Sequence, residues 1–413
     1  MTWYVIHIVD LLLWLTMAFS IVYIVFFALA SLSGHAKKRR HADARPAKFL
    51  VLYPAYHEDA VITHSVEQFL QQDYPADRYQ VVVISDHMTD ETNARLRSFP
   101  VTVLTPSFEK SSKAKALQHA IEEQGARGKE QAARGKEQGA SDKEQEAFDF
   151  VAILDADNVV EPDFLTRLNE VCHQGYKAIQ CHRCAKNSDN DVAVLDGVSE
   201  EINNTIFRKA HNVVGLSSAL IGSGMCFDYQ WFANNVHALS SAVEDRELET
   251  LLAQQKVFVK YVEDIHVFDE KVSNADNFQR QRLRWMTGQV QSLVLMLPYI
   301  PRAIVTGNIN YIDKTVQQAL IPRSILIVLT ALLCMVSTVV SLLFIHSWLF
   351  TLKWWCLFFM LCVSLLIAMP AQMRTHAVIG RLTSLPGLVW RMMSNVAKID
   401  HKNKEFIHTT HTK

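Results

Sequence analysis

Three long apolar runs without a charged side chain limit what this chain can fold into. They cover residues 11–33, 324–345 and 354–370. As helices, runs of this length cross the hydrocarbon layer of a bilayer, which is about 30 Å thick. The first run is too long and too aromatic for a cleaved signal peptide. A buried core helix is the alternative, but the basic residues after the first run favour a membrane span. We therefore predict transmembrane helices in residues 1–33, 324–345 and 354–370.

Basic residues beside these runs predict the orientation of the chain. Residues 34–46 form a basic linker that contains the run KKRR. Because cytoplasmic loops carry an excess of Lys and Arg, we expect the following domain in the cytoplasm. The tail of residues 371–413 is also basic, with Arg374 and Arg381, so the second and third helices form a hairpin with both ends in the cytoplasm. We expect a multi-pass protein of the inner or plasma membrane, with membrane lipids as partners.

Residues 289–323, before the second run, are too interrupted to span. Pro298, Pro301, Arg302 and Lys314 divide their apolar turns. Two interpretations fit equally well: helices that lie in the membrane interface, and ordinary packing against the polar domain. The tail of residues 371–413 is likewise expected to hold a cytoplasmic interfacial helix.

Charge and cysteine content argue against two classes of protein. The 41 Lys and Arg residues nearly cancel the 42 Asp and Glu residues, so we expect no nucleic-acid partner. The seven cysteines are dispersed, which is not typical of a disulfide framework and indicates a reducing compartment for the polar part. Cys181 and Cys184 form one C-x-x-C pair without a second pair, which favours a structural role over a zinc site.

Residues 47–288 alternate short β-rich runs with helical ones. Expected strands are residues 48–53, 80–84, 101–104, 150–154 and 177–180, and expected helices are residues 60–72, 113–123 and 163–173. Continuous apolar strands separated by helices predict an α/β fold, with a doubly wound, mainly parallel sheet covered on both faces. Ligands bind such sheets beyond the carboxyl ends of the strands. We therefore expect the chemistry at residues 54–59, 85–92 and 155–158.

Residues 123–147 do not fit this alternation. They form a seven-residue near-repeat, EQGARGK, EQAARGK, EQGASDK, EQEA, in which alanine is the only recurring apolar residue. A coiled coil needs large apolar side chains along its seam. We therefore predict a solvated, partly helical insertion whose deletion is tolerated.

The strongest local signal for chemistry is FVAILDADN, an apolar strand that ends in two acids. Asp155 and Asp157 would lie at the ligand edge of the sheet, where a hard divalent cation prefers oxygen ligands. We expect Asp157 to bind the metal directly and Asp155 to face a nucleotide. Acids after a strand also cap the next helix, although Asp163 is better placed for that role.

Two further clusters follow along the chain. Glu244 and Asp245 stand at the start of a predicted helix, where they could simply favour the helix dipole. Gln281, Arg284 and Trp285 are spaced to share one helical face. A guanidinium suits phosphate oxygens, and an indole suits the face of a sugar ring. A basic interfacial helix would explain the arginines of this segment, but not the glutamine and the tryptophan.

In this order, the motifs resemble those of the inverting family 2 glycosyltransferases. The similar branch is membrane-embedded and includes cellulose, chitin and hyaluronan synthases and ceramide glucosyltransferase. The resemblance covers roughly residues 47–289. The matched segments are PAYHE at residues 54–58, Asp86 after the second strand, SKAKALQ at 112–118, DAD at 155–157, VED at 243–245 and QRLRW at 281–285. Four motifs in register are more specific than any one of them.

The resemblance implies a GT-A fold and a role for each matched residue. The nucleotide and donor site would contain Pro54, Tyr56, Glu58, Asp86, Lys113, Asp155, Gln281 and Arg284. The acceptor site would contain Gly222, Ser223, Gly224, Glu244 and Trp285, with Asp157 as the metal ligand and Asp245 as the catalytic base. Two positions depart from the family: His57 replaces the usual asparagine, and Ser85 precedes Asp86 where paired acids are usual. Uridine remains the expected base.

The implied reaction is attack of an acceptor hydroxyl on an anomeric carbon, with loss of a nucleoside diphosphate and with Mg²⁺ or Mn²⁺ as cofactor. Inversion would give a β-linkage to a carbohydrate or lipid-linked acceptor. The leading hypothesis is polysaccharide or exopolysaccharide synthesis. The alternatives are single addition to a lipid and a catalytically inactive membrane sensor of nucleotide sugars. Three spans are few for a secretion channel, which favours the lipid alternative, or a pore built by an oligomer or a secretion partner.

Overall fold

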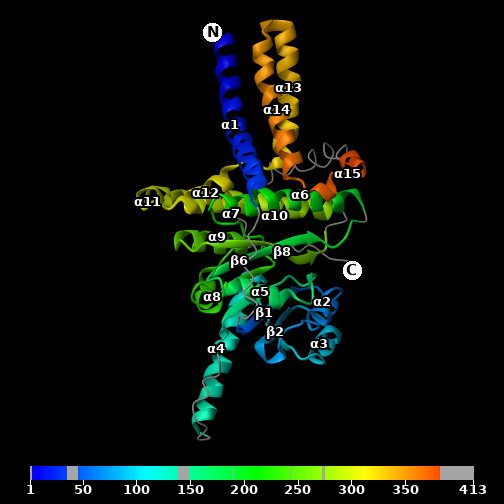
Figure 1. The fold of residues 1–413 in the computed structure, drawn as a ribbon, viewed down its shortest axis with the longest axis vertical. Helices are drawn as coiled ribbons and strands as arrows, with labels where there is room; N and C mark the ends of the chain where they lie inside the picture. Colours follow the sequence, from blue (N-terminus) through cyan, green and yellow to red (C-terminus); the bar gives the residue numbers. More distant parts are fainter. Residues whose placement is uncertain are drawn as a thin grey trace.

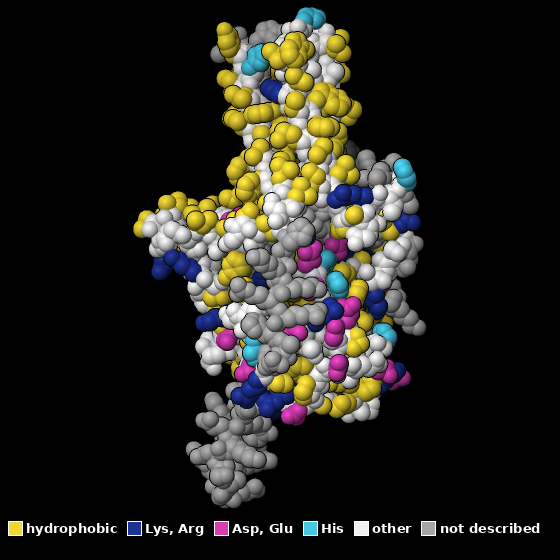
Figure 2. All heavy atoms as spheres, in the orientation of Figure 1, with side chains coloured by type: hydrophobic (Ala, Val, Ile, Leu, Met, Phe, Trp, Pro, Cys, Tyr) yellow, Lys and Arg dark blue, Asp and Glu magenta, His cyan; other side chains and the backbone are white. Residues whose placement is uncertain are grey.

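The computed structural model describes residues 2–34, 45–137, 148–188, 190–241, 243–271 and 275–381. Three apolar helices, α1 (Thr2–Ala30), α13 (Arg323–Val340) and α14 (Trp348–Ala368), stand together at one end of the molecule (Figure 1). Within the described residues, Tyr4–Ser33, Arg323–Ile345 and Trp348–Ala368 are long and apolar enough to cross a membrane. On the face shown in Figure 2, hydrophobic side chains predominate along these helices.

Helix α14 begins before the run that predicts it, because a charged residue inside it has a partner. The apolar run starts at residue 354, directly after Lys353. In the structure, Lys353 forms an ion pair with Asp10 of α1. The indole of Trp354 donates a hydrogen bond to the same carboxylate at 2.9 Å. This pairing lets the charge lie within the helix and joins α14 to α1.

An eight-stranded sheet forms the centre of the polar domain, in the order β3-β2-β1-β4-β7-β6-β8-β5. Its strands are β1 (Phe49–Tyr56), β2 (Tyr79–Asp86), β3 (Thr102–Leu104), β4 (Phe150–Ile153), β5 (Val159–Val160), β6 (Ala178–Ala185), β7 (Met225–Asp228) and β8 (Val259–Asp269). Strands β1 to β4 pair in parallel, as do β6 and β8. Strand β7 runs antiparallel to β4 and β6, and β5 runs antiparallel to β8. The sheet is thus mainly parallel, as predicted.

Strands β5, β7 and β8 have no counterpart among the predicted strands. Strand β5 has two residues and β7 has four, which is too short for a pattern of alternation to show. Strand β8 is long, but Glu263 and Asp264 interrupt its apolar residues. The pairing of β6 with β8 shifts register there, between Cys181 and His182. Tertiary contacts, rather than local pattern, therefore define these strands.

Helices cover both faces of the sheet. They are α2 (Ile62–Phe69), α3 (Asp90–Arg97), α4 (Lys113–Glu137), α5 (Phe164–Cys172), α8 (Tyr229–Asn235) and α9 (Glu244–Gln254). Successive residues of a strand face opposite sides. Accordingly, Phe49 and Val51 of β1 belong to one buried cluster and Leu50 and Leu52 to another. Two apolar cores, one on each face, hold the sheet in place.

A layer of helices lies between the sheet and the three apolar helices (Figure 1). It contains α6 (Asp191–Asn203), a π-helical turn (Asn204–Lys209), α7 (Ala210–Val213), α10 (Ala275–Met296), α11 (Ile300–Val305), α12 (Ile309–Ala319) and α15 (His376–Arg381). Helix α12 buries Tyr311 and Thr315, whereas Ile304 of α11 and Ile309 are exposed. Residues 289–323 thus have features of both predicted arrangements: packing on the polar domain and an exposed apolar side.

Helix α4 continues beyond its predicted end at residue 123 into the near-repeat. It reaches Glu137 and leads away from the sheet (Figure 1). Ala120 and Ile121 are its last residues in the buried core, and residues 125–127 are exposed. Residues 138–147, the rest of the predicted insertion, lie outside the described part of the chain.

We predict that Gly125→Ala stabilises the protein by about 0.5–1 kcal/mol, because alanine reduces the backbone entropy that glycine loses in a helix. A Cβ atom at Gly125 meets no atom within 4 Å. The matched control is Gly288→Ala in α10, where the Cβ atom would lie 2.6 Å from Cγ1 of Val243. This variant should be less stable than the wild type. Thermal unfolding in detergent measures both changes, and a lower midpoint for Gly125→Ala would contradict the prediction.

Candidate active site

A cavity of about 1250 Å³ lies beyond the carboxyl ends of β1, β2 and β4 and continues between the apolar helices. Most of the predicted site residues line it, namely Pro54, Tyr56, Glu58, Asp86, Lys113, Asp155, Asp157, Gly222, Glu244, Asp245, Gln281, Arg284 and Trp285. Ser223 and Gly224 are not on its wall. The three motif clusters, far apart in sequence, therefore open onto one space.

Ser223 contacts Asp155 of the cavity wall, and Gly224 bonds to strand β4. The Ser223 hydroxyl bonds to the side chain of Asn158 and accepts from the backbone of Asp155 at 3.4 Å. Gly224 donates its backbone N–H to Ile153 at 3.0 Å, and a Cβ there would lie 3.0 Å from Val267. Their role in acceptor binding stays a prediction.

Lys113 joins three segments of the site. It is the first residue of α4, and its Nζ contacts Asp155, the carbonyl oxygen of Gly222 at 2.5 Å and Glu244 at 3.5 Å. Burial alone would lower the pKa of Lys113, but Asp155 and Glu244 raise it above its ordinary value. The ammonium therefore stays charged and offsets the acids around it.

Hydrogen bonds to the backbone hold Asp155 and Asp157 in place. The Asp157 side chain is buried, and its Oδ2 accepts from the Glu270 N–H at 2.7 Å. Its Oδ1 accepts from the Asn158 amide at 3.2 Å, while the Asp155 N–H donates to Asn158 at 2.9 Å. The turn after β4 is thus closed by Asn158, which keeps both carboxylates at the sheet edge.

The second acid pair occupies the first turn of α9. Glu244 is buried, and its pKa is raised to about 7, first by burial and then by Asp245 and Asp155, with Lys113 opposing. Gly222 (φ +81°) faces both acids, because a Cβ there would lie 3.7 Å from Glu244 Oε1 and 3.8 Å from Asp245 Oδ2. The absence of a side chain at residue 222 leaves the space above the two carboxylates open.

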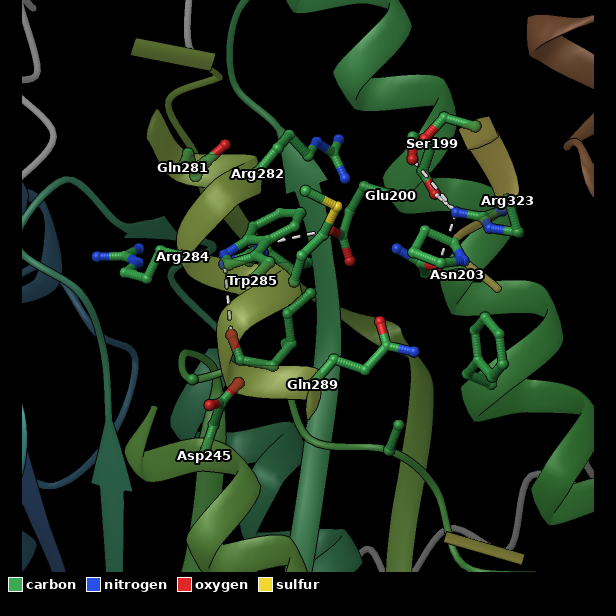
Figure 3. Close-up of a pocket in the computed structure, with 18 of the residues that line it drawn as sticks. Ser199, Glu200, Asn203, Asp245, Gln281, Arg282, Arg284, Trp285, Gln289 and Arg323 are labelled. Atoms are coloured by element: carbon green, nitrogen blue, oxygen red, sulfur yellow. Dashed lines mark hydrogen bonds and ion pairs between the residues drawn. The ribbon is translucent and has the colours of Figure 1, made fainter. Parts of the chain in front are cut away.

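Helix α10 presents the third cluster. In Figure 3, Arg284 and Arg282 point to opposite sides of Trp285, and Asp245 lies below the indole. Arg282 pairs with Asp196 of α6, and its guanidinium lies 4.5 Å from the centroid of the Trp285 ring. Arg282 therefore orients the tryptophan. Arg282 is not among the predicted site residues, although it stands inside the QRLRW segment.

A buried ion network on the cavity wall has no sequence signal. Arg183 of β6 pairs with Glu200 of α6 at 3.2 Å and with Asp269 at 3.4 Å, and Arg208 pairs with Glu200 at 2.9 Å. Burial opposes ionisation of both Arg183 and Glu200. Even so, Asp269 and Glu200 raise the pKa of Arg183, and Arg183 and Arg208 lower the pKa of Glu200. Single charged residues in unrelated segments form this network only in the folded chain.

The predicted C-x-x-C pair is separated by the alternation of β6. Cys181 is buried in the core, whereas Cys184 lies with His182 and His266, whose potential ligand atoms are all within 4.8 Å of one another. His182 is already paired with Glu201 at 3.0 Å. Burial lowers its pKa, but Cys184 and Glu201 raise it to about 10. The group therefore holds a histidine–glutamate ion pair.

Comparison with protein families identifies the domain. Residues 46–288 match the family described as "Glycosyltransferase like family 2". Because the match covers more than half of the chain, the chain belongs to this family. Together with the mainly parallel sheet, it confirms the expected GT-A fold. No curated protein matches the chain.

Solved structures that resemble the chain do so distantly. A mannosyltransferase of Pyrobaculum calidifontis in complex with GDP-Man and Mn²⁺ has 16% identity and a TM-score of 0.47, covering 86% of this chain and 97% of its own. Residues 1–349 of TarS from S. aureus have 14% identity and a TM-score of 0.38, covering 85% and 90%. Glucosyl-3-phosphoglycerate synthase of Mycobacterium tuberculosis with Mn²⁺, UDP and phosphoglyceric acid has 16% identity and a TM-score of 0.36, covering 57% and 74%.

The raised pKa of Glu244 predicts a pH-dependent stability. The folded protein keeps a proton that the unfolded chain releases at an ordinary pKa of 4.5. The resulting stabilisation is complete below pH 4.5 and is lost as the pH rises through about 7. In Glu244→Gln this loss should disappear, so the difference in unfolding midpoint between wild type and variant should change across that window. A constant difference over the window would contradict the assignment.

Proposed function

We propose that this chain is a membrane-bound, inverting glycosyltransferase that moves a sugar from a nucleotide sugar to an acceptor hydroxyl. The observation that supports this proposal is the convergence of Asp155 and Asp157, Asp245, and Arg284 with Trp285 on one cavity. These side chains suit the three groups that such a reaction must handle, which are a departing diphosphate, the proton of the acceptor hydroxyl and a sugar ring. The three apolar helices and the basic linker suggest a multi-pass protein with the catalytic domain in the cytoplasm.

The donor would bind at the carboxyl ends of β1, β2 and β4. Asp86 closes β2, lies on the cavity wall and bonds to His87 at 2.6 Å, so it is well placed to face the base and ribose of a uridine nucleotide. Lys113 and Arg284 would bring positive charge to the diphosphate. Uridine is the base that the family resemblance favours.

Asp155 and Asp157 fit a divalent cation. Both carboxylates face the cavity, and Mg²⁺ and Mn²⁺ prefer such hard oxygen donors. Asp157 would be the direct ligand, with Asp155 beside the nucleotide. When bound, the cation supplies positive charge next to the diphosphate as negative charge develops there.

Asp245 would act as the catalytic base. It would accept the proton of the acceptor hydroxyl while that oxygen attacks the anomeric carbon from the face opposite the diphosphate. The bond from the anomeric carbon to the diphosphate oxygen breaks, and its electron pair leaves with the nucleotide. Attack from the back inverts the configuration, so an α-linked donor gives a β-linked product. Trp285 would stack on the acceptor sugar.

The biological product has two candidates. The family resemblance favours a growing polysaccharide. Single addition to a lipid acceptor is favoured by the inner part of the cavity, where aliphatic residues of α13 and α14 form the wall. The length of the product distinguishes the two, because polymerisation yields a ladder and single addition yields one glycolipid. Failure to consume any donor would instead indicate a nucleotide-sugar sensor.

We predict that Asp245→Asn lowers sugar transfer by about 10² to 10⁴-fold, the usual contribution of a general base. The affinity for the nucleotide should remain nearly unchanged, because the proposed contact of Asp245 is with the acceptor hydroxyl and not with the nucleotide. The matched control is Asp77→Asn, whose side chain is 81% exposed and outside the cavity. Turnover with a panel of nucleotide sugars and Mn²⁺, together with nucleotide binding, measures the effect. Unchanged turnover would refute the role of Asp245.

Metal removal should also abolish transfer. We expect chelation to stop product formation and added Mn²⁺ or Mg²⁺ to restore it. Asp157→Asn should need a higher metal concentration for half-maximal rate, because it removes one anionic ligand. Full activity in the presence of excess chelator would exclude this metal requirement.

A further inference from the structure

The cavity has two chemically different ends. At the sheet edge its wall carries the acids and cations of the candidate active site. Between the apolar helices its wall is aliphatic and aromatic, with residues such as Ile327, Ala331, Met335, Phe358, Leu366 and Met369. We call this second part the apolar chamber. A polar sugar gains little from contact with such a wall. A hydrocarbon chain is stabilised there, because burying apolar surface is favourable.

Arg323 stands at the entrance to the apolar chamber. It is the first residue of α13 and lies on the cavity wall. Its Nη2 donates to the carbonyl oxygen of Ser199 at 2.9 Å, to the Ser199 hydroxyl at 3.2 Å and to Asn203 at 2.8 Å. All these acceptors are neutral. Among the described residues, no carboxylate pairs with Arg323, and its Nε and Nη1 donate no hydrogen bond.

Four cations on the same wall, Lys113, Arg183, Arg208 and Arg282, are paired with acids, whereas Arg246 bonds to the amide of Gln318. Lys113 contacts Asp155, and Arg282 contacts Asp196. Glu200, which lies on α6 between Ser199 and Asn203, is shared by Arg183 and Arg208. A guanidinium next to an apolar chamber is costly without a counter-charge. Arg323 therefore has both the positive charge and the spare donors to hold an anion.

The anion is most simply a phosphate. A guanidinium offers a planar fork of donors that matches phosphate oxygens. Arg323 is also the first residue of a helix long and apolar enough to span, which puts it at the level where lipid headgroups begin. Figure 3 shows Arg284 and Arg323 on opposite sides of Trp285. Two anions could thus be held apart, with the acceptor sugar between them.

We infer that the acceptor is a sugar joined to a long-chain lipid through a phosphate or diphosphate. The phosphate binds Arg323, and the lipid chain fills the apolar chamber. This inference rests on the proposed function. The reacting hydroxyl belongs to the lipid-linked group beside Trp285, and its proton goes to Asp245. One C–O bond forms to the donor's anomeric carbon, and the bond to the nucleoside diphosphate breaks. The phosphate at Arg323 is unchanged by the reaction.

Lipid binding tests this assignment directly. The probes are a polyprenyl phosphate, the matching neutral polyprenol and inorganic phosphate, each added to the full chain in micelles of a phosphate-free, non-ionic detergent and measured by native mass spectrometry. We expect the wild type to bind the lipid phosphate about tenfold to a hundredfold more tightly than the polyprenol, the usual range for one charge-assisted contact. Equal binding of the two lipids, or equally effective competition by inorganic phosphate, would overturn the inference.

Variants of Arg323 identify the group responsible. Arg323→Gln should lose the preference for the lipid phosphate and keep the affinity for polyprenol, whereas Arg323→Lys should keep part of the preference. The matched control is Arg302→Gln on α11, an exposed residue outside the cavity, which should change neither affinity. A preference that survives in Arg323→Gln would overturn the inference. Because the wild-type comparison needs no variant, poor folding of a variant does not remove the test.

Transfer assays separate this inference from the proposed function. Efficient transfer to neutral acceptors, at equal rates in wild type and Arg323→Gln, would refute the lipid-phosphate site and leave the glycosyltransferase assignment intact. No transfer from any nucleotide sugar to any acceptor would refute the proposed function, while the binding measurements would still decide whether Arg323 holds a lipid phosphate.

Discussion

The site depends on one shared cation. Lys113, at the start of α4, contacts Asp155 after β4, Glu244 at the start of α9, and the backbone of Gly222. Without this positive charge, the carboxyl groups of Asp155, Glu244 and Asp245 would lie close together in a partly buried space, and their mutual repulsion would be costly. The ammonium lets the turn after β4 and the first turn of α9 approach. The charges that would handle a diphosphate and a proton are adjacent for this reason.

A second group of polar contacts links the first apolar helix, α1, to the helices α7 and α12 of the layer that covers the sheet. The Tyr23 hydroxyl of α1 donates to Asp313 of α12 at 2.7 Å and lies 2.9 Å from the ring of His211 in α7. The ring of Phe27 stacks on His211, with 3.7 Å between the centroids. Buried polar groups need partners, so this contact fixes the position of α1 against α7 and α12. The cavity can therefore run from the sheet edge into the apolar chamber without a break.

The cavity is amphipathic, with a charged end at the sheet edge and an apolar end between α13 and α14. Its outer end is arranged for charge, because ion pairs such as that of Arg183 with Glu200 hold cations and acids in fixed places. Its inner end is arranged for hydrocarbon, because α13 and α14 contribute only side chains without charge beyond Arg323. A substrate that fits both ends must itself be amphipathic. This property is the reason why we propose an acceptor from the membrane for the candidate chemistry at Asp245.

Much of the fold and of the site could be predicted from the sequence. The apolar runs reveal the three long helices, since the need to bury or span apolar surface is local in the sequence. The end of strand β4 predicts Asp157 at the ligand edge of the sheet, because the carboxyl ends of parallel strands meet there. Asp245 and Arg284 stand on helices α9 and α10, and the folded chain brings them to the same cavity. Short or polar strands such as β7 and β8 were missed, because neither carries a periodic pattern of its own.

The sequence by itself determined which residue types could carry out the chemistry, and at what spacing. Only the tertiary structure decided that Ser223 and Gly224 are not on the cavity wall, that Arg282 orients Trp285, and that Cys181 and Cys184 face different surroundings. It also decided that Arg323 meets neutral partners at the entrance to the apolar chamber. The physical reason is that a side chain's counter-charges come from segments distant in sequence, and only the packed chain brings them within reach.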